Sequence, residues 1–169
     1  MLKELSPSII LHAGDISQPL VLEELSGVAQ VLAVRGNRDW RWSPKLPMEE
    51  KLEINGARLI LLHGHGSWGH YFADKMDHTL RGYRLDRYEK YLTKRFPDAD
   101  GYIFGHSHFP ENSWAGGKLF FNPGSACLGG RRDILPSFGS MRIDADGRLE
   151  AEITPLDGFK IVDKEWVSV

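Results

Sequence analysis

The sequence predicts an α/β protein with parallel strands in its core. Two observations carry this prediction: short apolar runs recur along the chain, and a helix-like segment separates the first two of them. Residues 8–13 form the first apolar run and residues 31–34 form the second. Strand, helix and strand in this order are typical of a parallel sheet, whose strands are buried on both faces.

The segment between these two runs is predicted to be a short helix. Pro19 fits the first turn of a helix, because the N–H that proline lacks would have no partner there. The helix is expected to end before Gly27. Four apolar residues would form its core-facing side: Leu20, Val21, Leu22 and Leu25.

The middle of the chain predicts a hairpin and a longer helix. Asn55-Gly56 is a pair typical of two-residue hairpin turns. Apolar residues at helical spacing extend over residues 71–96, with Gly82 as a point of division and Pro97 as the end. Further strands are predicted at 52–54, 58–62 and 101–104, and antiparallel strands at 119–121, 140–143 and 149–154.

The composition fits one compact domain that spans residues 1–169. The chain is 41% hydrophobic and 26% charged, and 21 Lys and Arg against 23 Asp and Glu leave a net charge of −2. This balance argues against strong binding of nucleic acid by charge alone. No apolar run approaches the about 18 residues of a membrane span. One cysteine, Cys127, and the lack of a signal-peptide pattern predict a cytoplasmic protein without membrane association.

Polar side chains of metal-binding type follow four of the predicted strands. Each of these strands ends beside a glycine, and ligands bind beyond the carboxyl ends of strands in open α/β sheets. A single histidine or Gly-Asp pair is more often structural, but four such strand ends in one chain favour a shared site. A mixed oxygen and nitrogen donor set suits Mn²⁺, Fe or Zn²⁺. The candidate residues are Asp15, Asn37, His63, His106 and His108.

These motifs resemble a known family. The ordered set Gly-Asp at 14–15, Gly-Asn-x-Asp at 36–39, His-Gly at 63–64 and Gly-His-x-His at 105–108 resembles the calcineurin-like metallophosphoesterase superfamily. Together with Asn-Pro-Gly-Ser at 122–125, it is most similar to the small bacterial phosphodiesterase branch of the YfcE type. The resemblance implies an α/β/β/α sandwich with mixed sheets.

The resemblance also implies roles for the candidate residues and a reaction. Asp15 would bridge two divalent metal ions, while Asn37, His63 and His106 would complete one site and His108 would belong to the other. Mn²⁺ is the first choice of metal, with Fe, Zn²⁺ or Ni²⁺ as alternatives. The implied activity is hydrolysis of a small phosphodiester or nucleotide-like substrate by a metal-activated hydroxide.

One departure from the family concerns the beginning of the chain. The family opens with a strand that ends in Asp-x-His, whereas residues 1–7 contain no Asp or His. The first βα unit is therefore expected to be missing, and the chain is expected to hold one metal ion better than two. The strand at residues 9–11 would then have an exposed edge, which predicts lower stability or a homo-oligomer.

A second departure is Arg38, which stands where many relatives have histidine. Arginine can bind a phosphate oxygen but cannot donate a proton at neutral pH. Asp39 is predicted to orient histidine or asparagine ligands, and residues 122–125 to support the loop of His106. His65 is a candidate substrate-binding residue, and His12 is predicted to be structural.

Three interpretations of the whole chain remain open at this point. The first is a metal-dependent phosphoesterase. The second is a non-catalytic interaction or scaffold protein on the same fold with a degraded metal site, which the missing motif favours. The third is a truncated fragment of an active enzyme. Retention of the five candidate ligands favours an enzyme over a scaffold.

Overall fold

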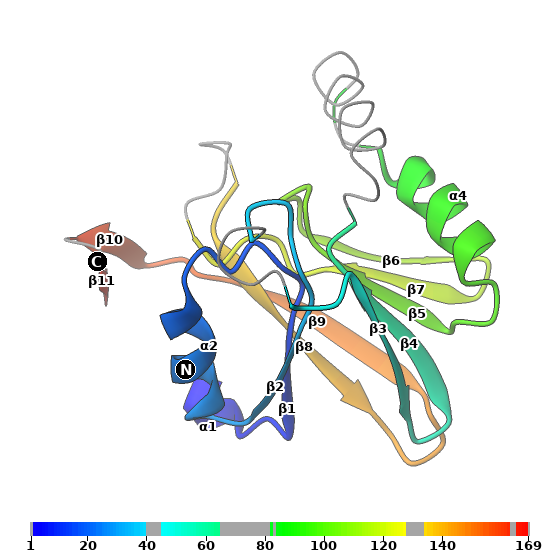
Figure 1. The fold of residues 1–169 in the computed structure, drawn as a ribbon, viewed down its shortest axis with the longest axis horizontal. Helices are drawn as coiled ribbons and strands as arrows, with labels where there is room; N and C mark the ends of the chain where they lie inside the picture. Colours follow the sequence, from blue (N-terminus) through cyan, green and yellow to red (C-terminus); the bar gives the residue numbers. More distant parts are fainter. Residues whose placement is uncertain are drawn as a thin grey trace.

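The computed structural model describes residues 2–39, 45–64, 82, 84–127, 134–162 and 165–168 (Figure 1). The first elements along the chain are α1 (Leu2–Leu5), β1 (Ile9–His12), α2 (Pro19–Ser26) and β2 (Gln30–Ala33). The central part holds β3 (Glu49–Ile54), β4 (Ala57–Leu62), α4 (Leu85–Arg95), β5 (Gly101–Phe104), β6 (Glu111–Ala115) and β7 (Lys118–Asn122). The last strands are β8 (Ser137–Ile143), β9 (Leu149–Pro155), β10 (Phe159–Val162) and β11 (Glu165–Ser168).

The largest sheet has five strands in the order β3-β4-β5-β7-β6. Strands β4, β5 and β7 are parallel, while β3 and β6 pair antiparallel at the two edges. The predicted hairpin turn joins β3 to β4, where Asn55 has a φ of 51° and Gly56 a φ of 82°. Positive φ at both positions is what this kind of tight turn requires, so the prediction from Asn-Gly is confirmed.

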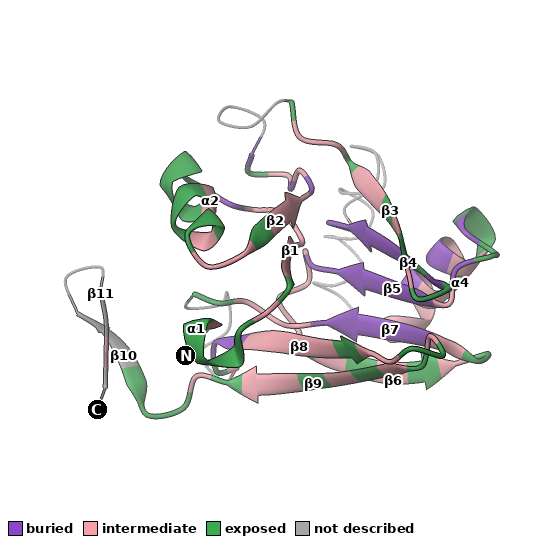
Figure 2. Cartoon of the chain, turned by 90° about the horizontal axis from the view of Figure 1, so that it is seen from below, coloured by how far each residue is buried: buried purple, intermediate pink, exposed green. Residues whose placement is uncertain are grey.

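Each face of this sheet is covered. On one face, Tyr88 and Leu92 of α4 pack against aromatic and aliphatic side chains of β4, β5 and β7. On the other face, buried residues such as Leu61 and Ile103 meet side chains of β1, β8 and β9. Figures 1 and 2 show the layers in the order α2, the smaller β ribbons, the large sheet and α4. The predicted α/β/β/α sandwich with mixed sheets is confirmed.

The smaller β layer consists of two separate ribbons. Strands β1 and β2 are parallel, and β8 and β9 are antiparallel. The carbonyl of His12 accepts from the N–H of Val34 at 3.1 Å, on the side of β1 that faces β2. Backbone groups of successive residues in a strand point to opposite sides, so those of Ile9 and Leu11 point to the edge of β1 away from β2. Within the described part of the chain, β1 pairs with β2 alone.

Some predicted elements differ from the structure. The apolar residues of α2 are not buried: Leu20 and Val21 are exposed, because the helix lies at the outside of the β1–β2 ribbon. Strand β7 pairs in parallel with β5 as well as antiparallel with β6, so the later strands are not all antiparallel. The described part of the predicted long helix begins at Leu85, and residues 71–81 lie outside the description.

Strands β6, β10 and β11 were not predicted. Strand β6 begins with three consecutive polar residues, Glu111, Asn112 and Ser113, which weakens the apolar signal of an edge strand. Among the described helices, none is long and apolar enough to cross a membrane.

Candidate metal centre

The carboxyl ends of β1, β2, β4 and β5 meet on one side of the molecule. Glycine permits this close approach: a Cβ added at Gly14 would lie 2.6 Å from the amide nitrogen of Gly36, and one added at Gly36 would overlap Asp15. The ends of β4 and β5 are also joined, because the N–H of Gly105 donates to the carbonyl of His63 at 3.2 Å. The structure therefore brings the loops of Asp15, Asn37, His63 and His106 together.

Several non-glycine residues in these loops have left-handed backbone conformations. The φ angles are 57° for Asp15, 66° for His106 and 59° for His108. Left-handed φ values are unfavourable for residues with a Cβ. Residues in such strained conformations are common at functional sites, where the surrounding structure enforces them.

His63 is the most buried of the five predicted ligands. It is 1% exposed, and its Nδ1 lies 2.6 Å from the carbonyl oxygen of Ala13. Because a carbonyl can only accept, Nδ1 carries a proton in this contact, and the second ring nitrogen, Nε2, is turned toward the neighbouring loops. This Nε2 lies 3.0 Å from Oδ1 of Asn37 and 3.4 Å from Oδ1 of Asp15.

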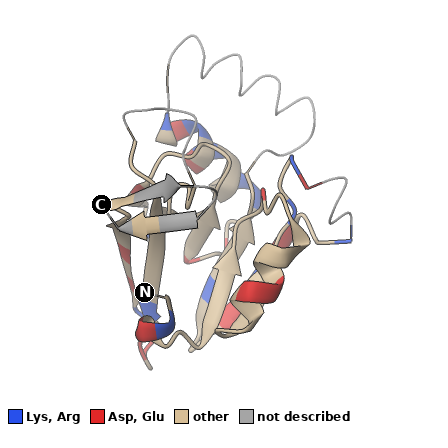
Figure 3. Cartoon of the chain, turned by 90° about the vertical axis from the view of Figure 1, so that its left-hand side faces the viewer, with Lys and Arg blue, Asp and Glu red and all other residues tan. Residues whose placement is uncertain are grey.

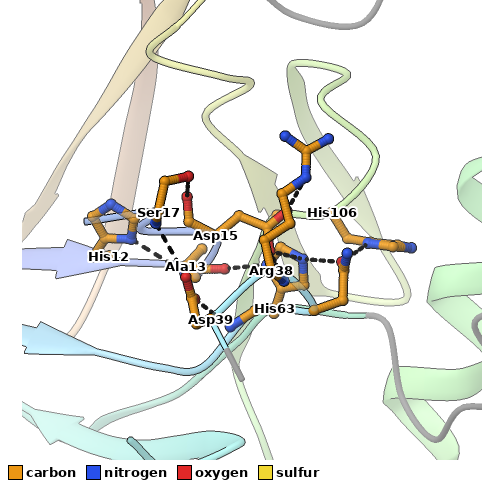
Figure 4. Close-up of polar contacts among 12 residues, drawn as sticks. His12, Ala13, Asp15, Ser17, Arg38, Asp39, His63 and His106 are labelled. Atoms are coloured by element: carbon orange, nitrogen blue, oxygen red, sulfur yellow. Dashed lines mark hydrogen bonds and ion pairs between the residues drawn. The ribbon is translucent and has the colours of Figure 1, made fainter. Parts of the chain in front are cut away.

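The amide of Asn37 contacts the imidazoles of both His63 and His106, two residues that are labelled in Figure 4. Its Oδ1 lies 2.9 Å from Nδ1 of His106 and 3.0 Å from Nε2 of His63, and the centres of the two rings are 5.1 Å apart. Asn37 is needed for this convergence: in the described part of the chain, no three His, Cys, Asp or Glu side chains alone are arranged to hold a metal ion.

The donor set of these side chains fits one divalent cation. Asp15 Oδ1 and Asn37 Oδ1 both lie beside Nε2 of His63, at 3.4 and 3.0 Å. A carboxylate oxygen, an amide oxygen and an imidazole nitrogen are together ligands that Mn²⁺, Fe and Zn²⁺ take in proteins. His106 adds a second imidazole on the same amide oxygen.

Asp39 holds the two oxygen-bearing loops together. Its side chain is 1% exposed, and its Oδ1 and Oδ2 accept from the backbone N–H groups of Ser17 at 3.2 Å and Gly36 at 2.8 Å. The sequence predicted that Asp39 orients histidine or asparagine side chains, whereas its observed hydrogen bonds go to the backbone. Backbone donors such as Ser17 N–H carry no side-chain signal, so residue types could not reveal them.

Asn122 supports the loop of His106 and His108. This fully buried side chain donates to the carbonyl of Gly105 at 3.1 Å and to Oγ of Ser107 at 2.9 Å. It also accepts from the N–H of Gly124 at 3.0 Å. The prediction that residues 122–125 support this loop agrees with these contacts.

Arg38 lies on the solvent side of Asp15. Its backbone N–H donates to Asp15 Oδ1 at 2.9 Å, and its Nε lies 3.5 Å from Asp15 Oδ2. The Arg38 side chain is 63% exposed, whereas that of Asp15 is only 12% exposed. Arg38 can therefore contact both the buried carboxylate and a molecule from solvent.

His108 is near these charges but makes no hydrogen bond to Asp15, Asn37, His63 or His106 in the structure. Partial burial lowers the pKa of His108, the positive charge of Arg38 lowers it further, and the carboxylate of Asp15 opposes both effects. The expected pairing of His108 with Asp15 at a second metal ion therefore remains a prediction. His65, the other candidate for substrate binding, lies outside the described residues.

His12 makes only local contacts. Its Nδ1 accepts from the backbone N–H of Gly14 at 3.2 Å, and burial lowers the pKa of His12 against the opposing effect of the carboxylates of Asp39 and Asp15. This agrees with its predicted structural role.

Comparisons with known proteins agree with the motifs and the fold. Residues 1–146 match the calcineurin-like phosphoesterase superfamily domain. The chain is 29% identical over 149 residues to a probable metallophosphoesterase of Methanocaldococcus jannaschii, covering 88% of this chain and 67% of that protein. It is 32% identical over 145 residues to a probable metallophosphoesterase of Methanothermobacter thermautotrophicus, covering 86% and 74%. The chain belongs to the calcineurin-like phosphoesterase superfamily.

Solved structures show the same fold. The double mutant of Vps29 from Entamoeba histolytica has a TM-score of 0.71 at 24% identity, covering 99% of this chain and 86% of that one. Wild-type Vps29 from the same organism, complexed with Zn²⁺, has a TM-score of 0.63 at 24% identity, covering 91% and 85%. An archaeal phosphodiesterase has a TM-score of 0.60 at 17% identity, covering 90% and 87%.

Proposed function

We propose that this protein is a metal-dependent phosphoesterase that hydrolyses phosphodiester bonds in small, nucleotide-like substrates. The observation that carries the proposal is the convergence of Asp15 Oδ1 and Asn37 Oδ1 on Nε2 of His63, at 3.4 and 3.0 Å. Family membership supports phosphoester hydrolysis as the reaction.

The residues present could hold the cation and position the substrate. Asp15, Asn37, His63 and His106 would bind one divalent cation, with Mn²⁺ proposed and Fe, Zn²⁺ or Ni²⁺ as alternatives. Such a cation would supply Lewis acidity, which polarises a phosphoryl oxygen and lowers the pKa of a water molecule. Asp39 and Asn122 would keep the ligands in place through their hydrogen bonds to the loops.

Arg38 and the distribution of charge favour a small substrate. The exposed guanidinium of Arg38 can bind a phosphate oxygen, and His65 is proposed to do the same. Because arginine does not donate its proton at neutral pH, the leaving group should need little protonation, as in aryl esters. Figure 3 shows acidic and basic residues interspersed along the chain, an arrangement that does not favour a long polyanion.

The test is hydrolysis of a bis-aryl phosphate with and without added Mn²⁺. Asp15→Ala and His106→Ala should each lower the rate by about 10- to 100-fold or more, because each removes a side chain from the donor set. Asp98→Ala, an exposed carboxylate outside the site, is the matched control and should keep the wild-type rate. Equal rates in all four proteins would contradict the proposed site.

The same assay separates the enzyme from an interaction protein on this fold. A folded wild-type protein that binds Mn²⁺ but hydrolyses no aryl, nucleotide or cyclic phosphodiester would favour the interaction protein. The zinc complex of Vps29 makes Zn²⁺ the first alternative metal to add before that conclusion.

A further inference from the structure

We infer that the guanidinium of Arg38 serves as the second cation of this site, so that the centre takes one divalent metal ion beside an arginine rather than two metal ions. The inference rests on the proposed function, because it assigns a metal stoichiometry and a charge-neutralising role within that same site.

The carboxylate of Asp15 directs its two oxygens to different partners. Oδ1 faces the metal-binding side, 3.4 Å from Nε2 of His63. Oδ2 lies 3.5 Å from Nε of Arg38 (Figure 4). Asp15 therefore bridges the donor set and the guanidinium, in the manner of a carboxylate between two cations.

Backbone hydrogen bonds hold the loop that carries Arg38 beside Asp15. The N–H of Arg38 donates to Asp15 Oδ1 at 2.9 Å, and this peptide unit lies between Asn37 and Asp39, which are both bound to the site. The guanidinium is thus attached to the same loop as a proposed metal ligand. Loss of its contact with Oδ2 would require only rotation of the side chain, which is 63% exposed.

The charge of Arg38 also opposes a second divalent ion beside Asp15. A divalent ion placed at Oδ2 would meet the positive charge of Arg38, because Nε of Arg38 lies 3.5 Å from that oxygen. At about 4 Å, this repulsion weakens binding by about 30-fold even at the dielectric constant of water.

This arrangement also assigns a role to Arg38 during hydrolysis. A guanidinium presents several N–H donors in one plane and can contact two oxygens at once. Arg38 would bind a phosphoryl oxygen and neutralise its negative charge while the single metal ion contacts the other side of the group. No proton leaves the guanidinium in this role.

The experiment is a titration with Mn²⁺, followed by electron paramagnetic resonance and by counting bound metal after gel filtration. The wild-type protein should bind one ion per chain and give the signal of isolated Mn²⁺, without the exchange coupling of a two-ion centre. Arg38→Ala should bind its first ion about three- to tenfold more tightly, because a positive charge near it is removed. Arg38→Lys keeps the charge and should remain close to wild type.

Arg58→Ala is a closely matched control. Arg58 also donates its backbone N–H to an aspartate, Asp100, and its Nε lies 3.4 Å from the Oδ2 of that residue. The Arg58 side chain is 54% exposed, and the pair contacts none of the proposed ligands. This variant should bind Mn²⁺ as the wild type does.

Activity gives the second measurement. Arg38→Ala with one bound Mn²⁺ should lose about 10- to 100-fold in kcat, and added guanidinium ion should restore part of the rate in this variant alone. Two tightly bound ions in the wild-type protein would overturn the inference. Equal Mn²⁺ affinity in Arg38→Ala, Arg58→Ala and wild type would also overturn it.

If the proposed function is wrong, the same experiments give a different set of results. If the wild-type protein binds one Mn²⁺, and Arg38→Ala binds it more tightly, the inference about the second cation holds even without hydrolysis. If neither protein binds Mn²⁺ or Zn²⁺, both proposals are wrong.

Discussion

The two β layers contribute equally to the candidate metal centre but are built very differently. Strands β4, β5 and β7 of the large sheet are almost entirely buried, whereas β1 has no fully buried residue and β2 begins with an exposed one (Figure 2). The buried strands deliver the imidazoles of His63 and His106, and the less buried ribbon delivers the oxygens of Asp15 and Asn37.

This difference shows that the two halves of the site are held in place by different forces. The imidazoles follow strands fixed by packing on both faces of the sheet. The oxygen ligands depend more on polar contacts at the strand ends: Asp39 to Ser17 and Gly36, and the carbonyl of Ala13 to His63. Substitutions in the large sheet should therefore affect stability most, and substitutions at the ribbon ends should affect metal binding most.

The largest expected effect concerns the large sheet, whose strands are held by apolar packing. Leu61→Ala empties a fully buried position and should lower the free energy of unfolding by about 3–5 kcal/mol. Leu11→Ala, in the ribbon, removes a partly buried side chain and should cost about 1–2 kcal/mol. Urea denaturation followed by circular dichroism measures both values. Equal losses would mean that the ribbon is as firmly packed as the sheet.

Asp39→Asn tests the polar contacts that hold the loops of Asp15 and Asn37 together. The substitution keeps the size of the side chain but replaces one of two acceptor oxygens by an amide donor, which faces a backbone N–H. We expect a loss of about 1–3 kcal/mol in the free energy of unfolding and about 10- to 100-fold weaker Mn²⁺ binding. Calorimetric titration with Mn²⁺ gives the second value. Loss of stability with unchanged metal affinity would show that Asp39 does not position the ligands.

Gly36→Ala should separate the two loops directly. The added Cβ would overlap Asp15, so the Asp15 loop must move away from Asn37. We expect about a tenfold or greater loss of Mn²⁺ affinity, with the large sheet still folded by near-ultraviolet circular dichroism. Gly27→Ala, where φ is −71° and the nearest atom to a new Cβ lies at 3.3 Å, is the control. Equal affinities in the two variants would contradict the close approach.

The smallest expected effect is a pH dependence of stability in the metal-free protein. Burial lowers the folded-state pKa of His12, so between that pKa and about 6.5 the unfolded chain binds more protons than the folded one. The contribution of His12 is therefore full above about pH 6.5 and is lost as the pH falls below it. His12→Gln should flatten the change in unfolding free energy between pH 7.5 and 5.5. An unchanged slope would show that His12 does not contribute.

Much of the architecture could be predicted from the chain because its signals are local. Pro19 begins a helix, Asn55-Gly56 forms a hairpin turn, and the apolar run at β5 is buried on both faces. The side on which α2 packs could not be predicted, because an apolar face such as that of Leu20 and Val21 is buried only if another element lies against it. The parallel pairing of β7 with β5 likewise depends on a long-range contact.

The sequence by itself determined which chemical groups the site contains: a carboxylate, an amide and imidazoles, each placed beside a glycine at the end of an apolar strand. It also determined that Arg38 cannot act as an acid, since this follows from the residue type. Only the tertiary structure decided that Asn37 joins the two imidazoles, that Asp39 binds backbone rather than side chains, and that Asp15 faces Arg38 with its second oxygen. The physical reason is that hydrogen bonds between distant loops depend on how two sheets stack. A local sequence pattern does not contain the information that determines this stacking.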